Sequence, residues 1–120
     1  MQLRSDNFEN GQRIPAICTF GKIADPFALS DNHSPHLAWK GAPPATRSFV
    51  LTCIDRDVPI CGYDVNQEGR TVPAGLPRVE FVHWLMADIP ADCRELAAGA
   101  CRHEVTPRGK REPFGPPGSE

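Results

Sequence analysis

The sequence predicts an all-β protein, and three observations lead to that class. Apolar and polar residues alternate with a period of two in most of the patterned segments, as they do in strands. Proline (13) and glycine (10) together make up about a fifth of the 120 residues, which is high for a helical protein. Only one short segment has a plausible helical pattern. Because 40% of the residues are hydrophobic, the chain can bury one core, and we expect a single folded domain.

The first predicted strands lie in the N-terminal half. Residues 13–20 have the pattern of an early strand that Pro15 interrupts. Residues 36–40 predict a short strand that ends in the turn at 41–44, Gly-Ala-Pro-Pro. Residues 48–55 are apolar on both faces, which is typical of a central, buried strand.

The second half contains one further strong strand. Residues 79–88 predict another central strand, closed by Ile89-Pro90. Residues 91–98 are the one plausible helical turn, and Gly99 would end it. Between the two central strands lies an irregular loop, residues 58–77, that contains three glycines and three prolines when its ends are counted. Loops of this length are uncommon in compact domains and are usually functional or mobile.

Charge, hydropathy and cysteine content exclude several classes of protein. A net charge of −2 gives no electrostatic reason to expect nucleic acid or an anionic membrane as a partner. The N-terminus lacks an apolar signal sequence, and no segment approaches the roughly 18 apolar residues of an integral membrane span. The five cysteines form no CxxC pair, so reduced thiols and a cytoplasmic location are expected. Cys53 is expected to be a core residue and Cys61 is the candidate for reactivity.

Asp55 and Asp57 follow the first central strand directly. If the chain stays extended through Pro59, both side chains lie on one face. Val58 precedes the proline, which favours the extended conformation. Two close carboxylates suit an anion pocket, a metal site or general acid/base catalysis. The alternative is structural: Asp57 caps a turn and Asp55 pairs with an arginine.

His83 shares a predicted strand face with Val79, Phe81 and Leu85. A histidine on an apolar face is either a hydrogen-bonded core residue or a member of a pocket, for which the Phe81 ring would form a wall. His33 and His36 have i, i+3 spacing, but no third ligand has a suitable spacing, so no metal site is predicted. No nucleotide-binding motif and no Gly-x-Ser-x-Gly nucleophile occur, so no cofactor and no catalytic residue are predicted.

Five motifs in order make the sequence similar to one known family. They are Ser34-Pro35-His36-Leu37-Ala38-Trp39, the run from Ala42-Pro43-Pro44 to Phe49-Val50-Leu51, Asp55-Arg56-Asp57-Val58-Pro59, His83-Trp84 and Asp88-Ile89-Pro90. Together they closely resemble the phosphatidylethanolamine-binding protein family, in its bacterial Raf-kinase-inhibitor-like branch (YbhB/YbcL type). The segment from Asp64 to Phe81 looks like a long-loop subgroup of that branch. The resemblance extends from about Phe8 to Gly109.

The resemblance implies a β-sandwich of antiparallel sheets with little helix and a small pocket for phosphate-type head groups. Carried over by motif position, the ligand-binding residues are Asp55, Asp57, Pro59, Phe81 and His83. There are two departures from the family. Val82 stands where many members carry a second histidine. The chain also ends at Glu120, before the strand with a His-Arg pair that completes the pocket in family members. Residues 1–120 are therefore interpreted as one such domain without its C-terminal strand or strands, which makes the chain a fragment or one completed by a partner.

The expected function is non-enzymatic binding of an anionic or phosphorylated small ligand, such as a phospholipid head group. By analogy with the family, the protein would regulate a kinase or a protease, and a homodimer is left open. Two other functions are weighed. One is a small hydrolase that uses Asp55, Asp57 and His83 as acid and base. The other is an interaction module that acts through the 58–77 loop.

Overall fold

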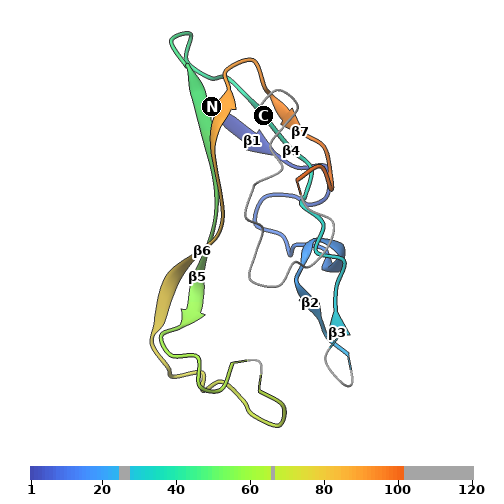
Figure 1. Ribbon diagram of the computed structural model, residues 1–120, viewed down its shortest axis with the longest axis vertical. Coiled ribbons are helices and arrows are strands. Elements are labelled where there is room, and N and C mark those ends of the chain that lie inside the picture. The colour runs from blue at the N-terminus through green and yellow to red at the C-terminus, as the bar shows by residue number, and fades with distance from the viewer. Residues whose placement is uncertain (25–27, 66, 102–120) are drawn as a thin grey trace. The chain divides into compact units, whose positions relative to one another are not determined.

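The structure is a computed structural model that describes residues 1–24, 28–65 and 67–101. The described residues form strands and a single 3-10 turn, without an α-helix, so the predicted all-β class is confirmed (Figure 1). The elements are β1 Gln2–Arg4, η1 Ala16–Cys18, β2 Gly21–Lys22, β3 Ala28–Leu29, β4 Leu37–Lys40, β5 Ser48–Pro59, β6 Arg78–Pro90 and β7 Glu95–Leu96. The contacts divide them into two compact units, one built from Met1–Phe49 and the chain from Asp88 on, the other from Val50–Ala87.

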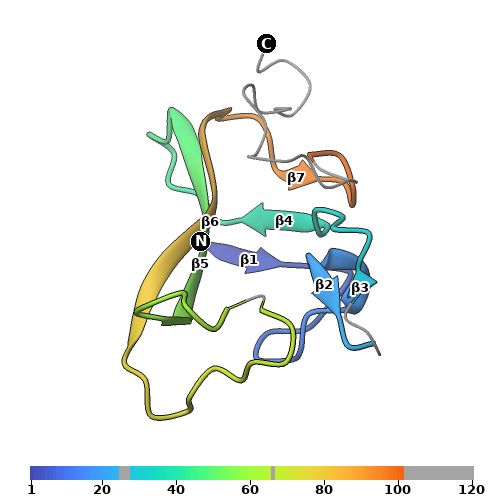
Figure 2. The ribbon, with the colours of Figure 1, turned by 60° about the horizontal axis from the view of Figure 1, so that its bottom comes forward.

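The first unit contains a three-stranded antiparallel sheet in the order β1-β4-β7 (Figure 2). In its register Leu3 lies opposite Trp39, and Leu37 lies opposite Leu96. The central strand β4 was predicted, and Leu37–Trp39 are buried in it because strands flank it on both sides. The two outer strands escaped prediction because each has only two or three residues, too few to establish a period.

Aromatic side chains fill the core of this unit. The rings of Trp39 and Phe49 meet edge to face, with centroids 5.5 Å apart and planes at 65°. The guanidinium carbon of Arg94 lies 5.2 Å from the centroid of Phe49. Ile89 and Leu96 are almost fully buried. An aromatic pair of this geometry contributes about 0.5–1.5 kcal/mol beyond its buried area.

Two local predictions for the first unit are wrong. Residues 13–20 were expected to be a strand, but they contain the 3-10 turn η1, which is closed by bonds from Cys18 N to Pro15 O (2.9 Å) and from Thr19 N to Ala16 O (3.0 Å). Pro15 has the φ of −60° that also suits the start of a turn, so the proline initiates η1 instead of interrupting a strand. Residues 91–98 were expected to be helical, but they form a tight turn and then β7. Pairing with β4 captures this segment, since Trp39 N donates to Arg94 O at 2.9 Å.

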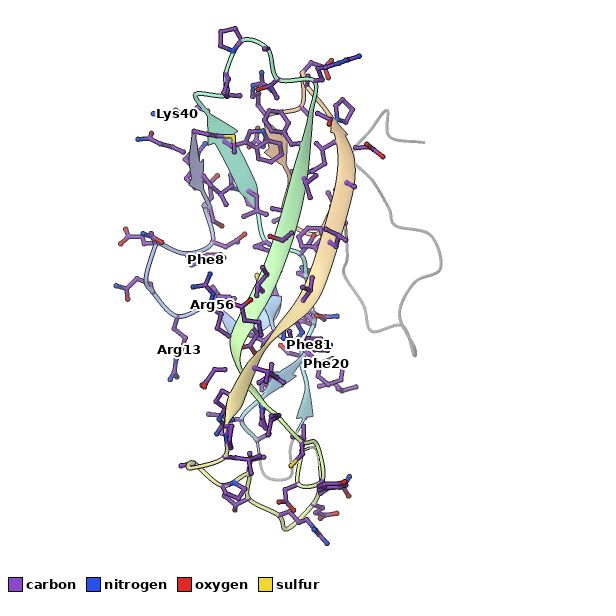
Figure 3. The ribbon with its side chains drawn as sticks, turned by 90° about the vertical axis from the view of Figure 1, so that its left-hand side faces the viewer. Phe8, Arg13, Phe20, Lys40, Arg56 and Phe81 are labelled. Atoms are coloured by element: carbon purple, nitrogen blue, oxygen red, sulfur yellow. The ribbon has the colours of Figure 1, made fainter. Side chains whose placement is uncertain are left out.

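The second unit consists of most of a long two-stranded ribbon, β5 paired with β6, and the loop that joins the two strands (Figures 1 and 3). Both strands were predicted, and both extend further than predicted. Their predicted burial is wrong: Val50 and Leu85 remain 63% and 61% exposed, and Cys53 is exposed instead of buried. The reason is the sheet itself, because among the described strands β5 and β6 pair only with each other.

In the described part of the chain, no helix has the length and apolar character needed to span a membrane.

Candidate functional site

Three of the predicted site residues meet on one face of the β5–β6 ribbon. Nε2 of His83 lies 3.4 Å from Oδ2 of Asp55, and the rings of Phe81 and His83 stand edge to face at 4.9 Å and 65°. Strand alternation produces this arrangement, since Phe81 and His83 are two residues apart on β6 and Asp55 lies across from them on β5. The His83 side chain is 52% exposed, so the alternative of a core histidine is wrong.

Asp55 is held by its own strand as well as by His83. The backbone N–H of Asp57 donates to Oδ1 of Asp55 at 2.8 Å, which leaves Oδ2 for the imidazole. This backbone hydrogen bond is the main reason that the pKa of the Asp55 carboxyl lies below its usual value. Slight desolvation opposes the lowering of the pKa, and the hydrogen bond and charge of His83 add to it. Asp55 is therefore a carboxylate over the whole neutral range.

Asp57 and Pro59 lie at the end of the ribbon where the loop joins the two strands. The Asp57 side chain is 87% exposed, and Pro59 is the half-buried last residue of β5. Just beyond it, Ile60 N donates to Pro77 O at 2.9 Å and closes the base of the loop. The extended conformation predicted through Pro59 is thus confirmed.

Arg78, the first residue of β6, joins this end of the ribbon to the loop. Nη1 donates to the backbone oxygen of Asp57 at 3.3 Å, Nη2 donates to the backbone oxygen of Pro73 at 3.4 Å, and Nε lies 3.8 Å from Oδ1 of Asp57. The structural alternative, in which Asp57 caps a turn and Asp55 pairs with an arginine, is wrong in both assignments. Asp57 lies beside the arginine, and Asp55 pairs with the histidine. Sequence analysis missed Arg78 because it is separated from Asp57 by 21 positions.

The opposite face of the ribbon carries a separate ion pair. Nε of Arg56 lies 3.2 Å from Oε1 of Glu80, and both residues alternate with the site residues along their strands. Figure 3 shows Arg56 and Phe81 leaving the ribbon on opposite sides. Arg56 is therefore not a member of the Asp55–His83 site, although it stands between the two aspartates in the sequence.

The second histidine that the sequence singled out has a structural environment. His36 is buried, and its Nδ1 accepts from Asp6 N at 2.9 Å while Nε2 lies 2.6 Å from Oε1 of Glu95. Because Nδ1 is an acceptor, Nε2 carries the hydrogen and donates to Glu95. The backbone N–H of His36 donates to Oδ1 of Asn7 at 2.6 Å. The imidazole thus links β7 to the segment after β1.

The described residues hold no cluster of three or more His, Cys, Asp or Glu side chains that could bind a metal ion. Desolvation raises the pKa of the Cys18 and Cys53 thiols, which disfavours the reactive thiolate at these two positions. Cys61 is half-buried in the loop. What the ribbon presents is an imidazole backed by a carboxylate, with an aromatic ring beside it.

A model of the phosphatidylethanolamine-binding protein family matches residues 4–119, which is almost the whole chain. The chain belongs to the phosphatidylethanolamine-binding protein family. The resemblance inferred from the five motifs is confirmed. The chain is 33% identical over 99 residues to the UPF0098 protein YbhB of Escherichia coli (strain K12), covering 82% of this chain and 50% of that protein.

Two further bacterial proteins are similar to most of this member of the phosphatidylethanolamine-binding protein family. A UPF0098 protein of Aquifex aeolicus (strain VF5) is 34% identical over 97 residues, which is 80% of this chain and 41% of the relative. The UPF0098 protein YbcL of Escherichia coli (strain K12) is 27% identical over 105 residues, or 88% and 46%. The chain thus spans about half the length of the curated relatives it matches. Membership supports a ligand-binding role in general.

Proposed function

We propose that the face of the ribbon formed by Asp55, Phe81 and His83 binds the phosphate-type group of a small anionic ligand, without catalysing a reaction. The observation that carries the proposal is the 3.4 Å contact between Nε2 of His83 and Oδ2 of Asp55, with the Phe81 ring against the imidazole. A half-exposed histidine held in this way has a ring nitrogen to offer a ligand, which a core histidine would not.

The arrangement of Asp55, His83 and Phe81 indicates how the ligand would be bound. Asp55, ionised and fixed by Asp57 N, accepts from Nε2 of His83 and orients the ring. In its protonated form the ring also donates from Nδ1 to a phosphate oxygen, as a charge-assisted hydrogen bond. Phe81 fixes the tilt of the ring and offers an apolar wall. Asp57 and Pro59 form the rim at the end of β5.

Isothermal titration of the full chain with inorganic phosphate and with phosphoethanolamine tests the proposal. His83→Gln should weaken both interactions about tenfold or more, since a hydrogen bond to a charged group is lost. Glu80→Gln, on the opposite face, is the matched control and should leave them unchanged. Binding to phosphatidylethanolamine vesicles, compared with soluble phosphoethanolamine, distinguishes a phospholipid from a free phosphorylated compound. Equal affinities for His83→Gln and wild type would refute the proposal.

The hydrolase alternative uses the same residues and is separable from binding. The described side chains around Asp55 and His83 include no serine or cysteine within hydrogen-bonding distance of the imidazole. We therefore favour binding. Turnover of a panel of phosphoesters that disappears in Asp57→Asn would favour the hydrolase, and binding without turnover would exclude it.

A role of the loop in binding a protein partner has one specific observation behind it. Tyr63 is 82% exposed and Ile60 is 59% exposed, so the 60–77 loop presents large apolar side chains to solvent. A kinase or protease is the class of partner that the family relationship suggests, and a second copy of the chain is the alternative. Shortening the loop between Ile60 and Pro77 should remove inhibition of such an enzyme while sparing phosphate binding. Loss of both together would count against a separate loop function.

A further inference from the structure

The charge balance of the proposed site needs one more residue than the family motifs supply. On this face of the ribbon, Asp55 and Asp57 carry two negative charges, and His83 supplies one imidazole. Asp55 has the imidazole of His83 as its partner at 3.4 Å. Asp57, with its side chain 87% exposed, would repel a phosphate group unless a cation stands beside it.

Arg78 is that cation. Among the residues that the structure describes, it is the only basic side chain within 4 Å of the Asp57 carboxylate, with Nε 3.8 Å from Oδ1. The nearer arginine in sequence, Arg56, is turned to the opposite face and paired with Glu80 at 3.2 Å. Arg78 alternates with Phe81 and His83 along β6, but at the loop end of the ribbon its guanidinium reaches the Asp57 carboxylate.

The position of the guanidinium is fixed by the backbone and does not depend on the carboxylate. Nη1 and Nη2 donate to the carbonyl oxygens of Asp57 and Pro73, at 3.3 and 3.4 Å. The Arg78 side chain is 29% exposed, against 81% for Arg56. The ion pair of Arg78 with the exposed Asp57 carboxylate adds little to stability. A partly buried arginine with two backbone contacts is instead a fixed positive charge beside the rim of the site.

We infer that Arg78 is a specificity-determining residue: its charge offsets Asp57 and makes this face of the ribbon acceptable to an anion. The inference rests on the proposed function. Arg78 lies outside the motif Asp55-Arg56-Asp57-Val58-Pro59. Arg56 lies inside that motif, but it has no part in binding. The ligand class is that of the proposed function, an anion with a phosphate-type group.

The test compares Arg78→Gln, Arg78→Lys and Arg56→Gln in the full chain, titrated with inorganic phosphate at low ionic strength. Arg78→Gln should weaken binding by about two- to tenfold, because the exposed charge of Asp57 is then left without its cation. Arg78→Lys keeps the charge and should stay within about twofold of wild type, and the matched control Arg56→Gln should do the same. The deficit of Arg78→Gln should shrink in high salt, because exposed charges are screened.

The outcomes separate this inference from the proposed function. If wild type binds phosphate and Arg78→Gln is no weaker than Arg56→Gln, the inference is overturned and the proposed function stands. If Arg78→Lys is as weak as Arg78→Gln, the hydrogen bonds and not the charge matter, and the inference is again overturned. If wild type binds no phosphate probe, both fail. Circular dichroism of each variant checks that the fold is retained.

Discussion

The carboxylate of Asp55 reaches across the β5–β6 ribbon to the imidazole of His83, with Oδ2 and Nε2 3.4 Å apart. The two residues are 28 positions apart in the chain and are brought together only by the pairing of the two long strands. Oδ1 of the same carboxylate accepts from Asp57 N, so each oxygen has a defined partner. This pair organises the proposed site.

The lowered pKa of Asp55 predicts a definite pH dependence. The pKa in the folded chain lies below the unfolded value of about 3.9. Ionised Asp55 therefore stabilises the fold above that value, and the contribution is lost as pH falls through the lower, folded pKa. The side chain is 44% exposed, so the effect is screened and small. A carboxyl-carbon NMR titration, repeated in concentrated urea, should show the lower pKa in the folded chain. A folded pKa equal to or above the urea value would contradict the assignment.

Replacing Phe81 should change the environment of His83 with little loss of stability. The Phe81 ring is 52% exposed, so Phe81→Leu should cost at most about 1 kcal/mol of unfolding free energy. The ring-current shift that Phe81 imposes on the imidazole hydrogens of His83 should disappear, since the two rings are 4.9 Å apart. Val82→Ala alters the neighbouring residue on the other face and should leave those NMR signals in place. Unchanged His83 signals in Phe81→Leu would show that the rings are apart in solution.

His36 should matter to stability far more than its neighbour His33. His36→Ala removes the imidazole that accepts from Asp6 N and contacts the Glu95 carboxylate. Leaving such partly buried groups unsatisfied costs about 1–3 kcal/mol of unfolding free energy. The matched control is His33→Ala, a half-buried histidine three residues earlier. Urea unfolding followed by tryptophan fluorescence measures both changes. Equal destabilisation by the two substitutions would mean that the imidazole of His36 does not hold these segments together.

Gly99 should tolerate a side chain poorly for reasons of backbone conformation. Its φ is +76°, whereas an added Cβ would find only ordinary contact, 3.8 Å from Nδ1 of His33. Gly99→Ala should therefore cost about 1–2 kcal/mol through the left-handed conformation. Gly75 has open space around it and no positive φ, so Gly75→Ala should leave the stability almost unchanged. Thermal unfolding of the two variants compares them, and a neutral Gly99→Ala would contradict the left-handed assignment.

Much of the fold was predictable because the long strands carry their pattern over many residues. The strands now assigned as β5 and β6 and the short buried β4 were identified from the pattern of their apolar residues alone. The two- and three-residue strands were not, since their formation depends on a partner distant in sequence, as β7 depends on β4. The same dependence explains why residues 91–98, helical by local pattern, pair as β7 instead.

The site was predictable in part for the same reason. Strand alternation alone places Phe81 beside His83 and sets Arg56 apart from the aspartates. The register that puts His83 against Asp55, and the contact that brings Arg78 to Asp57, are set by strand pairing across more than twenty residues. Burial was predicted least well. The apolar residues of a strand such as β5 indicate that its surface is to be covered, but they do not indicate which segment covers it.

The most direct test of the central claim is an NMR titration of imidazole-labelled wild-type chain with inorganic phosphate. The signals of His83 should shift saturably, while those of the buried, internally bonded His36 stay fixed and serve as the internal reference. The shift of His83 should be abolished in Asp55→Ala, which removes the carboxylate that orients the ring. A titration in which His83 does not respond, or in which His36 and His83 respond alike, would contradict the account.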